Sequence, residues 1–128
     1  MLDTDSVSFA LRGEGRVGER ILAQRPSVLC VSSITLAELR YGADKRQSRK
    51  LHRLIETFAA SVTVAPFDAA AANRFGKVAI ALDRRGSTIG GFDALIAAHA
   101  LTLGVTLVTH NSKHFGRVEG LKFESWYA

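Results

Sequence analysis

The side chains most able to do chemistry carry oxygen ligands and lie in segments far apart in the sequence. They are the carboxylates Asp3, Glu38 and Asp93, and the amide Asn111. Oxygen ligands of this kind suit Mg²⁺ or Mn²⁺ far better than zinc. Crowded carboxylates disfavour one another's ionised forms unless a cation lies among them. If the fold brings these side chains together, the sequence predicts a site for a divalent cation, which would also bind phosphate oxygens.

Each of these residues also has an explanation that involves no chemistry. Asp3 and Asn111 are of types that commonly form turns at strand ends. Thr35 and Glu38 have the spacing of a capping box at a helix start. Asp93 could serve only to complement the positive end of a helix dipole. The prediction of a site therefore depends on whether the fold makes these residues converge.

The charge balance indicates a polyanionic partner. Lysine and arginine number 17 against 12 aspartate and glutamate, a formal net charge of +5, which favours a polyanion such as a nucleic acid. The single cysteine, Cys30, cannot form an internal disulfide, and its apolar neighbours favour a buried position. A basic body with an acidic cation site suggests cleavage of a phosphodiester bond.

No segment predicts a membrane span or a targeting signal. The first five residues lack the basic start and the apolar stretch of a signal peptide, so we expect a cytoplasmic protein. The longest nearly apolar stretch, residues 95–108, contains His99 and is interrupted at Gly104. It is too short to cross a bilayer.

Short apolar runs alternate with helical patterns along the whole chain. Strands are predicted at residues 1–3, 28–32, 62–65 and 105–109, with a weaker candidate at 122–124. Helices are predicted at residues 17–24, 34–43, 47–58 and 93–103, and Asp68 could cap a further helix that reaches Arg85. This order predicts a single α/β domain over residues 1–128, a three-layer sandwich with a central parallel sheet of four or five short strands. Ligands of such sheets bind at the carboxyl edge, where the acidic residues would meet.

Four segments resemble, in the same order, the motifs of a known family. They are MLDTD at residues 1–5, SITLAELRYG at 33–42, IGGFDALIAAHA at 89–100, and LVTHN at 107–111 followed by His114 and Phe115. They are similar to the motifs of the PIN-domain ribonucleases, and within these of the VapC toxins of bacterial toxin–antitoxin pairs. Asp5 stands in place of the more familiar asparagine, and His114 stands where related chains often have an acid.

The resemblance implies a site and a reaction. Asp3, Glu38 and Asp93 would surround Mg²⁺ or Mn²⁺, and Asn111 matches a fourth position that can be Asp or Asn. Asp3 and Asp93 would be direct ligands. Glu38 would be either a ligand or the base that holds the attacking water. The reaction would be metal-assisted hydrolysis of structured RNA, either tRNA or rRNA, leaving a 5′-phosphate and a 3′-hydroxyl.

The same resemblance implies partners and supporting residues. A homodimer is implied, together with a small antitoxin whose C-terminal segment lies across the active groove. Thr4 and Asp5 would lie just outside the metal ligands. The sequence leaves open whether Asp5 touches the metal, orients water or hydrogen-bonds its neighbours.

Basic side chains near the expected sheet edge are candidates for RNA contact. They are Arg84, Arg85, Lys113, His114 and Arg117. A second basic stretch, residues 45–53, is predicted to be a solvated helix face, with a track for phosphates as the alternative. His99, on an apolar helix, is predicted to lie in the core or at an interface rather than to be catalytic.

Two other functions compete with this prediction. Asp3 and Asp5 have the spacing of the nucleophile and acid of a haloacid-dehalogenase-like phosphatase, but no Gly-Asp-x-x-x-Asp metal motif follows them. A catalytically idle PIN fold could instead regulate by binding RNA. Metal-dependent cleavage of structured RNA, compared with hydrolysis of a small phosphate ester, separates the three functions.

Overall fold

A narrow parallel sheet runs through the middle of the molecule. The computed structural model describes residues 1–128, with the strands β1 (Cys30–Ser32), β2 (Thr63–Ala65), β3 (Leu107–Val108) and β4 (Phe123–Glu124). β1 pairs with β2 and β3 pairs with β4, both in parallel. Leu2 joins the two pairs through parallel bridges to Val31 and Val108, which gives the order β2, β1, Leu2, β3, β4.

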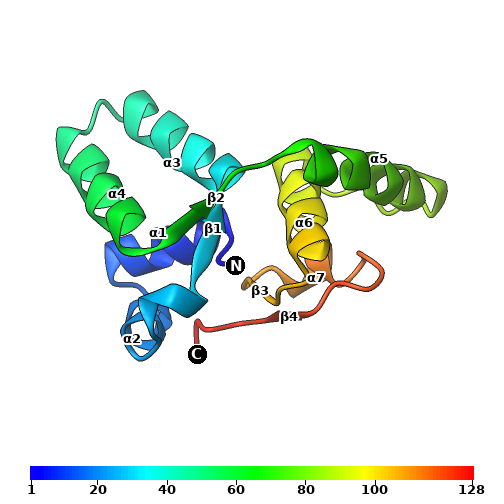
Figure 1. Cartoon of the computed structure of the whole chain (residues 1–128). Coiled ribbons are helices and arrows are strands. Elements are labelled where there is room, and N and C mark those ends of the chain that lie inside the picture. The colour runs from blue at the N-terminus through cyan, green and yellow to red at the C-terminus, as the bar shows by residue number, and fades with distance from the viewer.

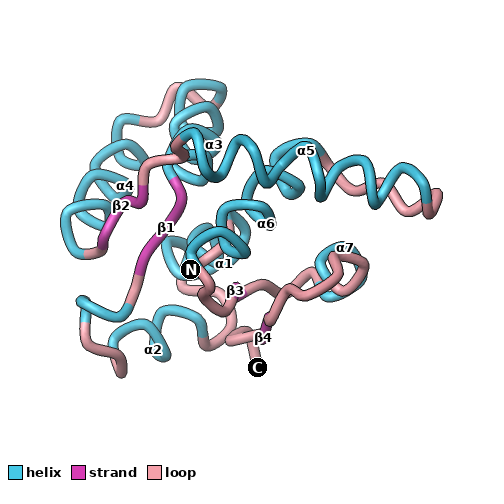
Figure 2. Tube along the Cα trace, turned by 45° about the vertical axis from the view of Figure 1, so that its right-hand side comes forward, coloured by secondary structure: helices cyan, strands magenta, loops and turns pink.

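Helices surround this sheet (Figure 1). They are α1 (Thr4–Arg12), α2 (Val17–Leu22), α3 (Ser33–Lys45), α4 (Arg49–Ser61), α5 (Ala69–Arg84), α6 (Gly91–Leu103), α7 (Ser112–Phe115) and the 3₁₀ helix η1 (Pro26–Val28). Figure 2 shows how short the strands are, in magenta, beside the helices in cyan. None of the helices combines the length and the apolar character that a membrane span requires.

Two apolar cores lie on opposite faces of the sheet. Successive side chains of a strand point to opposite faces: Met1 and Leu107 belong to one core, and Leu2 and Val108 belong to the other. Buried residues of α5, α6 and α7 complete the first core. Buried residues of α1, α3 and α4 complete the second. The predicted three-layer α/β sandwich with short parallel strands is therefore confirmed.

The chain leaves the sheet earlier than predicted at its N-terminus. The strand predicted over residues 1–3 is reduced to a bridge at Leu2, although the Met1 carbonyl and the Asp3 N–H still hydrogen-bond the backbone of Val108. Asp3 instead caps α1, a helix that the sequence did not lead us to predict, and its Oδ1 accepts the Ser6 N–H at 2.8 Å. Val7 and Leu11, four residues apart, were the available signal for this helix.

Other predicted elements occur with shifted ends. Asp68 caps α5 by accepting the Ala71 N–H at 3.0 Å. Gly104 ends α6 in the left-handed conformation that the C-terminus of a helix favours, with φ 67°. β1 is shorter than the predicted 28–32, because Pro26–Val28 form η1.

The structure differs from the prediction at two further places, one close to the expected site and one at the first core. β3 is shorter than the predicted 105–109, and α7, a helix that was not predicted, follows it. Asn111 begins α7 by accepting the His114 N–H at 3.4 Å. Cys30 is half-buried against the first core rather than fully buried.

Candidate active site

Asp3 lies where the chain leaves the sheet and enters α1. The residue is only 3% exposed. Burial raises the pKa of the Asp3 carboxyl, hydrogen bonds from Thr109 and Ser6 oppose that rise, and the nearby charge of Asp5 adds to it. The charge of Asp3 is therefore costly in the folded protein unless a cation approaches.

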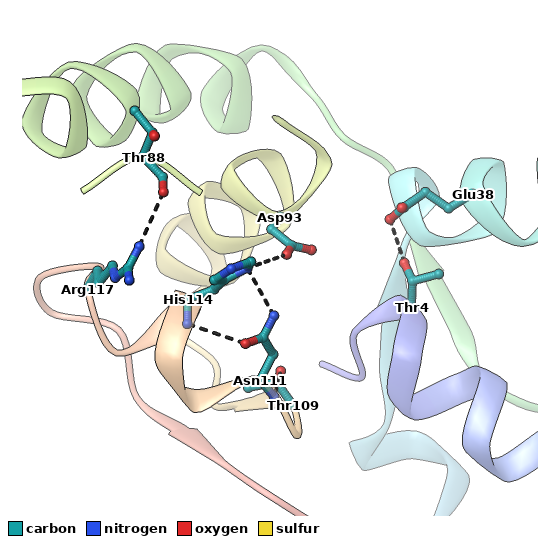
Figure 3. Close-up of polar contacts among 8 residues, drawn as sticks. All are labelled: Thr4, Glu38, Thr88, Asp93, Thr109, Asn111, His114 and Arg117. Atoms are coloured by element: carbon teal, nitrogen blue, oxygen red, sulfur yellow. Dashed lines mark hydrogen bonds and ion pairs between the residues drawn. The ribbon is translucent and has the colours of Figure 1, made fainter. Parts of the chain in front are cut away.

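Glu38 projects from α3 toward the start of α1 (Figure 3). Thr4 Oγ1 donates a hydrogen bond to Glu38 Oε1 at 2.6 Å, and the Thr35 hydroxyl lies 3.2 Å from that of Thr4. Burial is the main cause that raises the pKa of Glu38. The capping-box explanation is wrong, because α3 begins at Ser33 with Ser32 as its cap, which places Glu38 in the second turn.

Asp93 lies in the first turn of α6 and faces His114 of α7 (Figure 3). His114 Nδ1 lies 3.4 Å from Asp93 Oδ2 and 3.0 Å from the amide nitrogen of Asn111. One ring nitrogen cannot donate to Asp93 and accept from Asn111 at once, so the tautomer of the His114 ring selects its partner. Burial raises the pKa of Asp93, His114 opposes that rise, and the charge of Asp5 adds to it. His114, expected among the RNA contacts, thus lies beside the acids themselves.

These acids affect one another although they come from separate elements. Beyond the effect of burial, the charges of Asp93, Asp5 and Asp3 raise the pKa of Glu38. The charge of Asp5 also raises the pKa of Asp3 and the pKa of Asp93. Asp5 itself is exposed in the first turn of α1. The structure therefore brings the four carboxylates into one region at the carboxyl edge of the sheet, the acidic cluster.

The donor set suits a hard divalent cation, although the side chains do not converge on one point. No three acidic or histidine side chains lie close enough together to ligate a single ion. Mg²⁺ needs only one or two carboxylates, because it keeps several waters and takes further oxygens from a bound phosphate. Asp3, Glu38 and Asp93 offer oxygen ligands only, each with a raised pKa. A cation would relieve the repulsion that contributes to those shifts.

Thr109 belongs to this region but was missed in the sequence. It is 1% exposed, and its side chain opposes the rise that burial causes in the pKa of Asp3. Its hydroxyl also accepts the Asn111 N–H at 3.0 Å. Thr109 therefore connects the buried acid of α1 to the residue that begins α7. Its position at the end of a predicted strand was the available signal.

A buried hydrogen bond joins the helices that carry two of the acids. His99 of α6 is 1% exposed, and its Nδ1 lies 2.8 Å from Ser32 Oγ at the start of α3. Ser32 Oγ also accepts the Ile34 N–H at 3.0 Å, so one hydroxyl contacts both the start of α3 and His99. Since α6 carries Asp93 and α3 carries Glu38, this bond helps to fix their separation. The core position predicted for His99 agrees with its burial.

Two of the basic side chains expected to contact RNA are tied to the backbone. Arg85 Nη1 donates to the Arg117 carbonyl at 3.2 Å. Arg117 Nη1 donates to the Thr88 carbonyl at 3.3 Å, as Figure 3 shows. These bonds join the loop that leads into α6 to the segment that follows α7. Arg84 and Lys113 are exposed. All four lie on segments that flank Asp93 and His114 in the sequence.

A groove of about 380 Å³ between α1, α3 and α4 adjoins the acidic cluster. Thr4 and Glu38 line it, together with the apolar Leu51, Leu54 and Ile55 of α4. Basic side chains border it as well, namely Arg12, Arg46 and Lys50. An apolar wall of this kind suits an amphipathic segment of another protein.

Comparisons with known proteins extend over nearly the whole chain. The family model described as PIN domain matches residues 1–121. The chain is similar to the tRNA(fMet)-specific endonuclease VapC of Shigella flexneri, with 40% identity over 98% of this chain and 96% of that protein. It is also similar to Ribonuclease VapC2 of Haemophilus influenzae, with 36% identity over 98% of this chain and 96% of that protein.

A solved structure shares the fold. The chain superposes on one in the crystal structure of DNA-bound VapBC from Salmonella typhimurium with a TM-score of 0.88 and 35% identity. The match covers 98% of this chain and 96% of that chain. The likeness therefore includes every segment that contributes to the acidic cluster.

Proposed function

Because the chain belongs to the PIN domain family, and to the VapC ribonucleases within it, we propose that it is a Mg²⁺-dependent endoribonuclease acting as the toxin of a toxin–antitoxin pair. The observation that carries the metal dependence is the gathering of Asp3, Glu38 and Asp93, each with a raised pKa. A divalent cation would relieve their mutual repulsion, and Mn²⁺ could serve in the same place. Family membership favours this function over the haloacid-dehalogenase-like phosphatase.

The proposed substrate is a structured RNA, either a tRNA or an rRNA. The Shigella relative is named as specific for tRNA(fMet), and the net charge of +5 of this chain suits a polyanion. Exposed basic side chains flank the acidic cluster in the sequence and would hold phosphates beside it. They are Arg84, Arg85, Lys113 and Arg117.

In this proposal Asp3 and Asp93 hold the cation, and Glu38 either joins them or holds the attacking water. When bound, Mg²⁺ lowers the pKa of water and offsets the charge that grows on the scissile phosphate. Thr4 donates to Glu38 Oε1, which leaves Oε2 able to accept a hydrogen bond from water. Asp3 Oδ1 accepts the Ser6 N–H at 2.8 Å, which restrains the orientation of the carboxyl.

Asn111 and Asp5 have supporting roles in the proposed site. The amide of Asn111 lies 3.0 Å from His114 Nδ1 and its carbonyl oxygen accepts the His114 N–H at 3.4 Å. Asn111 therefore orients the ring that faces Asp93. Asp5 adds negative charge to the region and, because it is exposed, can order water there.

The test of this function is Asp93→Asn, assayed on a structured RNA in the presence of Mg²⁺. The amide has nearly the shape of the carboxylate but no charge, so Mg²⁺ should bind more weakly while the first turn of α6 is kept. We expect cleavage to fall by at least about 100-fold, since the loss of even an outer partner of a metal ligand typically costs about 10- to 100-fold. The rise in melting temperature that Mg²⁺ causes should shrink as well.

Asp83→Asn is the matched control, because Asp83 is exposed on α5 and lies outside the acidic cluster. Its cleavage rate should stay near that of the wild type. Wild-type cleavage that persists in excess EDTA would rule out the metal mechanism. Hydrolysis of a small phosphate ester without RNA cleavage would favour the phosphatase, and RNA binding without cleavage would favour the idle fold.

A cognate antitoxin is the proposed protein partner. A solved relative is described as DNA-bound VapBC, and the groove between α1, α3 and α4 includes Glu38. An amphipathic antitoxin segment in this groove would cover the acidic cluster, and a basic side chain on it would pair with the carboxylates. The homodimer and the cytoplasmic location expected from the sequence stay predictions.

A further inference from the structure

Three aromatic rings gather where β3 ends, next to the acidic cluster. His110 stacks on Tyr127, with the ring centroids 4.5 Å apart and the planes 20° from parallel. The ring of Phe9, on α1, meets both at steep angles, with its centroid 4.9 Å from that of Tyr127 and 6.0 Å from that of His110. The outer face of His110 is the one turned away from Tyr127. A ring stacked over that face would lie nearer to His110 than to Tyr127, whereas Phe9 lies nearer to Tyr127. Phe9 therefore lies beside the stack and not over that face.

The stack is held in place by its surroundings. His110 Nδ1 lies 3.0 Å from the Ser125 hydroxyl, and the Tyr127 hydroxyl donates to Glu14 at 3.1 Å. The Tyr127 ring also packs closely on Gly15, where an added Cβ would lie 2.8 Å from it. His110 is nevertheless exposed. An exposed ring that is already ordered loses little conformational freedom when a ligand binds.

His110 lies between two residues of the acidic region. Thr109, before it, follows Val108, whose carbonyl accepts the Asp3 N–H at 3.0 Å, and Asn111, after it, contacts His114. Figure 3 shows Thr109 and Asn111 near His114 and Asp93. Consecutive Cα atoms are about 3.8 Å apart, so the backbone of His110 lies at the rim of the proposed site. A nucleic acid with a phosphate at the carboxylates would bring a neighbouring nucleotide to this rim.

We propose that His110, stacked on Tyr127, is a platform for an unpaired base of the RNA substrate, beside the scissile phosphate. This inference rests on the proposed ribonuclease function and adds a base-binding position to it. Proteins that recognise single-stranded segments of RNA stack the bases on aromatic side chains, histidine among them. Such a contact requires a base that is free to leave its helix. It therefore directs cleavage toward loops within a structured RNA.

The experiment measures the affinity of the full chain for a short single-stranded oligoribonucleotide, in the Asp93→Asn background that suppresses cleavage. We expect His110→Ala to weaken binding about 5- to 100-fold, the usual range for loss of one stack between a base and an aromatic ring. His110→Phe keeps a flat ring and should keep most of the affinity. His110→Leu has no flat ring and should bind as weakly as the alanine variant. His52→Ala is the control and should bind normally, because His52 lies on α4 and contacts Asp44.

An abasic nucleotide placed at successive positions of the oligoribonucleotide identifies the stacked base. At one position it should weaken binding by the same factor as His110→Ala, and it should have no further effect in that variant. The proposal would be overturned if the abasic nucleotide lowered the RNA affinity equally at every position, both with His110 present and in the His110→Ala variant. A lower melting temperature with unchanged RNA affinity would also overturn it, since the stack would then only anchor the C-terminal segment. The ribonuclease function would survive either result, because it fails only if the wild-type chain does not cleave RNA.

Discussion

Asp3 both caps a helix and supplies a carboxylate to the acidic cluster. As a cap it accepts the Ser6 N–H at the positive end of α1, which favours the charged carboxylate. Burial works in the opposite direction and is the larger effect, so the pKa of Asp3 is raised. The helix therefore holds the carboxylate in position while the surrounding protein makes its charge unfavourable, and a bound cation would reverse that balance.

Asp3→Asn should change how the stability of the metal-free protein depends on pH. The folded-state pKa of Asp3 lies above the ordinary value of 3.8. Between the two values the folded protein binds more protons than the unfolded chain, so its free energy of unfolding falls as the pH rises. Asparagine also caps α1 but does not titrate. We expect the variant to be more stable than the wild type near neutral pH in EDTA, with an advantage that shrinks toward pH 3.8.

Urea unfolding of both proteins across this pH range measures the difference. Added Mg²⁺ should stabilise the wild type more than the variant and so reduce the advantage. A variant less stable than the wild type at neutral pH would contradict the expectation. It would mean that the native carboxylate contributes more as a cap than it costs by burial.

Helix α4 faces both the second core and the groove beside the acidic cluster. Ile55 is fully buried in that core, whereas the neighbouring Leu54 is 38% exposed and lines the groove. Apolar side chains left exposed together in a groove are typical of a surface that a partner covers. The groove between α1, α3 and α4 is thus the structural counterpart of the proposed antitoxin contact.

Leu54→Glu should weaken binding of the cognate antitoxin by about 10- to 100-fold, because the lost burial of one leucine costs about 1.5–3 kcal/mol. Titration calorimetry measures the dissociation constant. RNA cleavage by the free variant should be unchanged, since Leu54 lies outside the acidic cluster. Leu103→Glu is the matched control, as Leu103 is 47% exposed at the end of α6 and does not line the groove. An equal loss of affinity in both variants would argue against the groove.

The whole molecule carries opposite charges in different places. Its net charge is +5, yet the carboxyl edge of the sheet gathers four acids, and neighbouring acidic charges raise the pKa of Asp3, Glu38 and Asp93 beyond the effect of burial. A polyanion would be attracted to the molecule as a whole and repelled locally at this edge. The proposed cation is what would make the edge able to receive a phosphate.

Replacing Arg84 and Lys113 together with alanine should make RNA binding less sensitive to salt. Each phosphate contact contributes about 0.7–0.9 to the slope of log affinity against log salt concentration, so two lost contacts should flatten it by about 1.5. The pair Lys45 and Arg49 is the control, because these residues lie at the end of α3 and the start of α4, on the face predicted to be solvated. Fluorescence anisotropy at several salt concentrations measures both slopes. If the double variant at Arg84 and Lys113 kept the wild-type slope, the RNA would not contact these two residues.

The sequence by itself determined the features that depend on residues close together in the chain. The helix cap at Asp68 and the left-handed helix end at Gly104 depend only on neighbouring residues, and both occur as predicted. The alternation of short apolar runs with helical patterns determined the parallel sandwich, since each pattern describes which face of an element is buried. It also placed Asp3, Glu38 and Asp93 near strand ends and helix starts, where the fold brings them together.

Only the tertiary structure decided the features that join distant segments. The strand predicted at residues 1–3 is reduced to a bridge at Leu2, which pairs with segments about 30 and 106 residues away, and α1 begins at Thr4. His114 faces Asp93, 21 residues away, although the sequence suggested only a contact with RNA. The stack of His110 on Tyr127 likewise links β3 to the C-terminal segment. Local propensity cannot encode such contacts, because their energy exists only after both segments have packed against the same sheet.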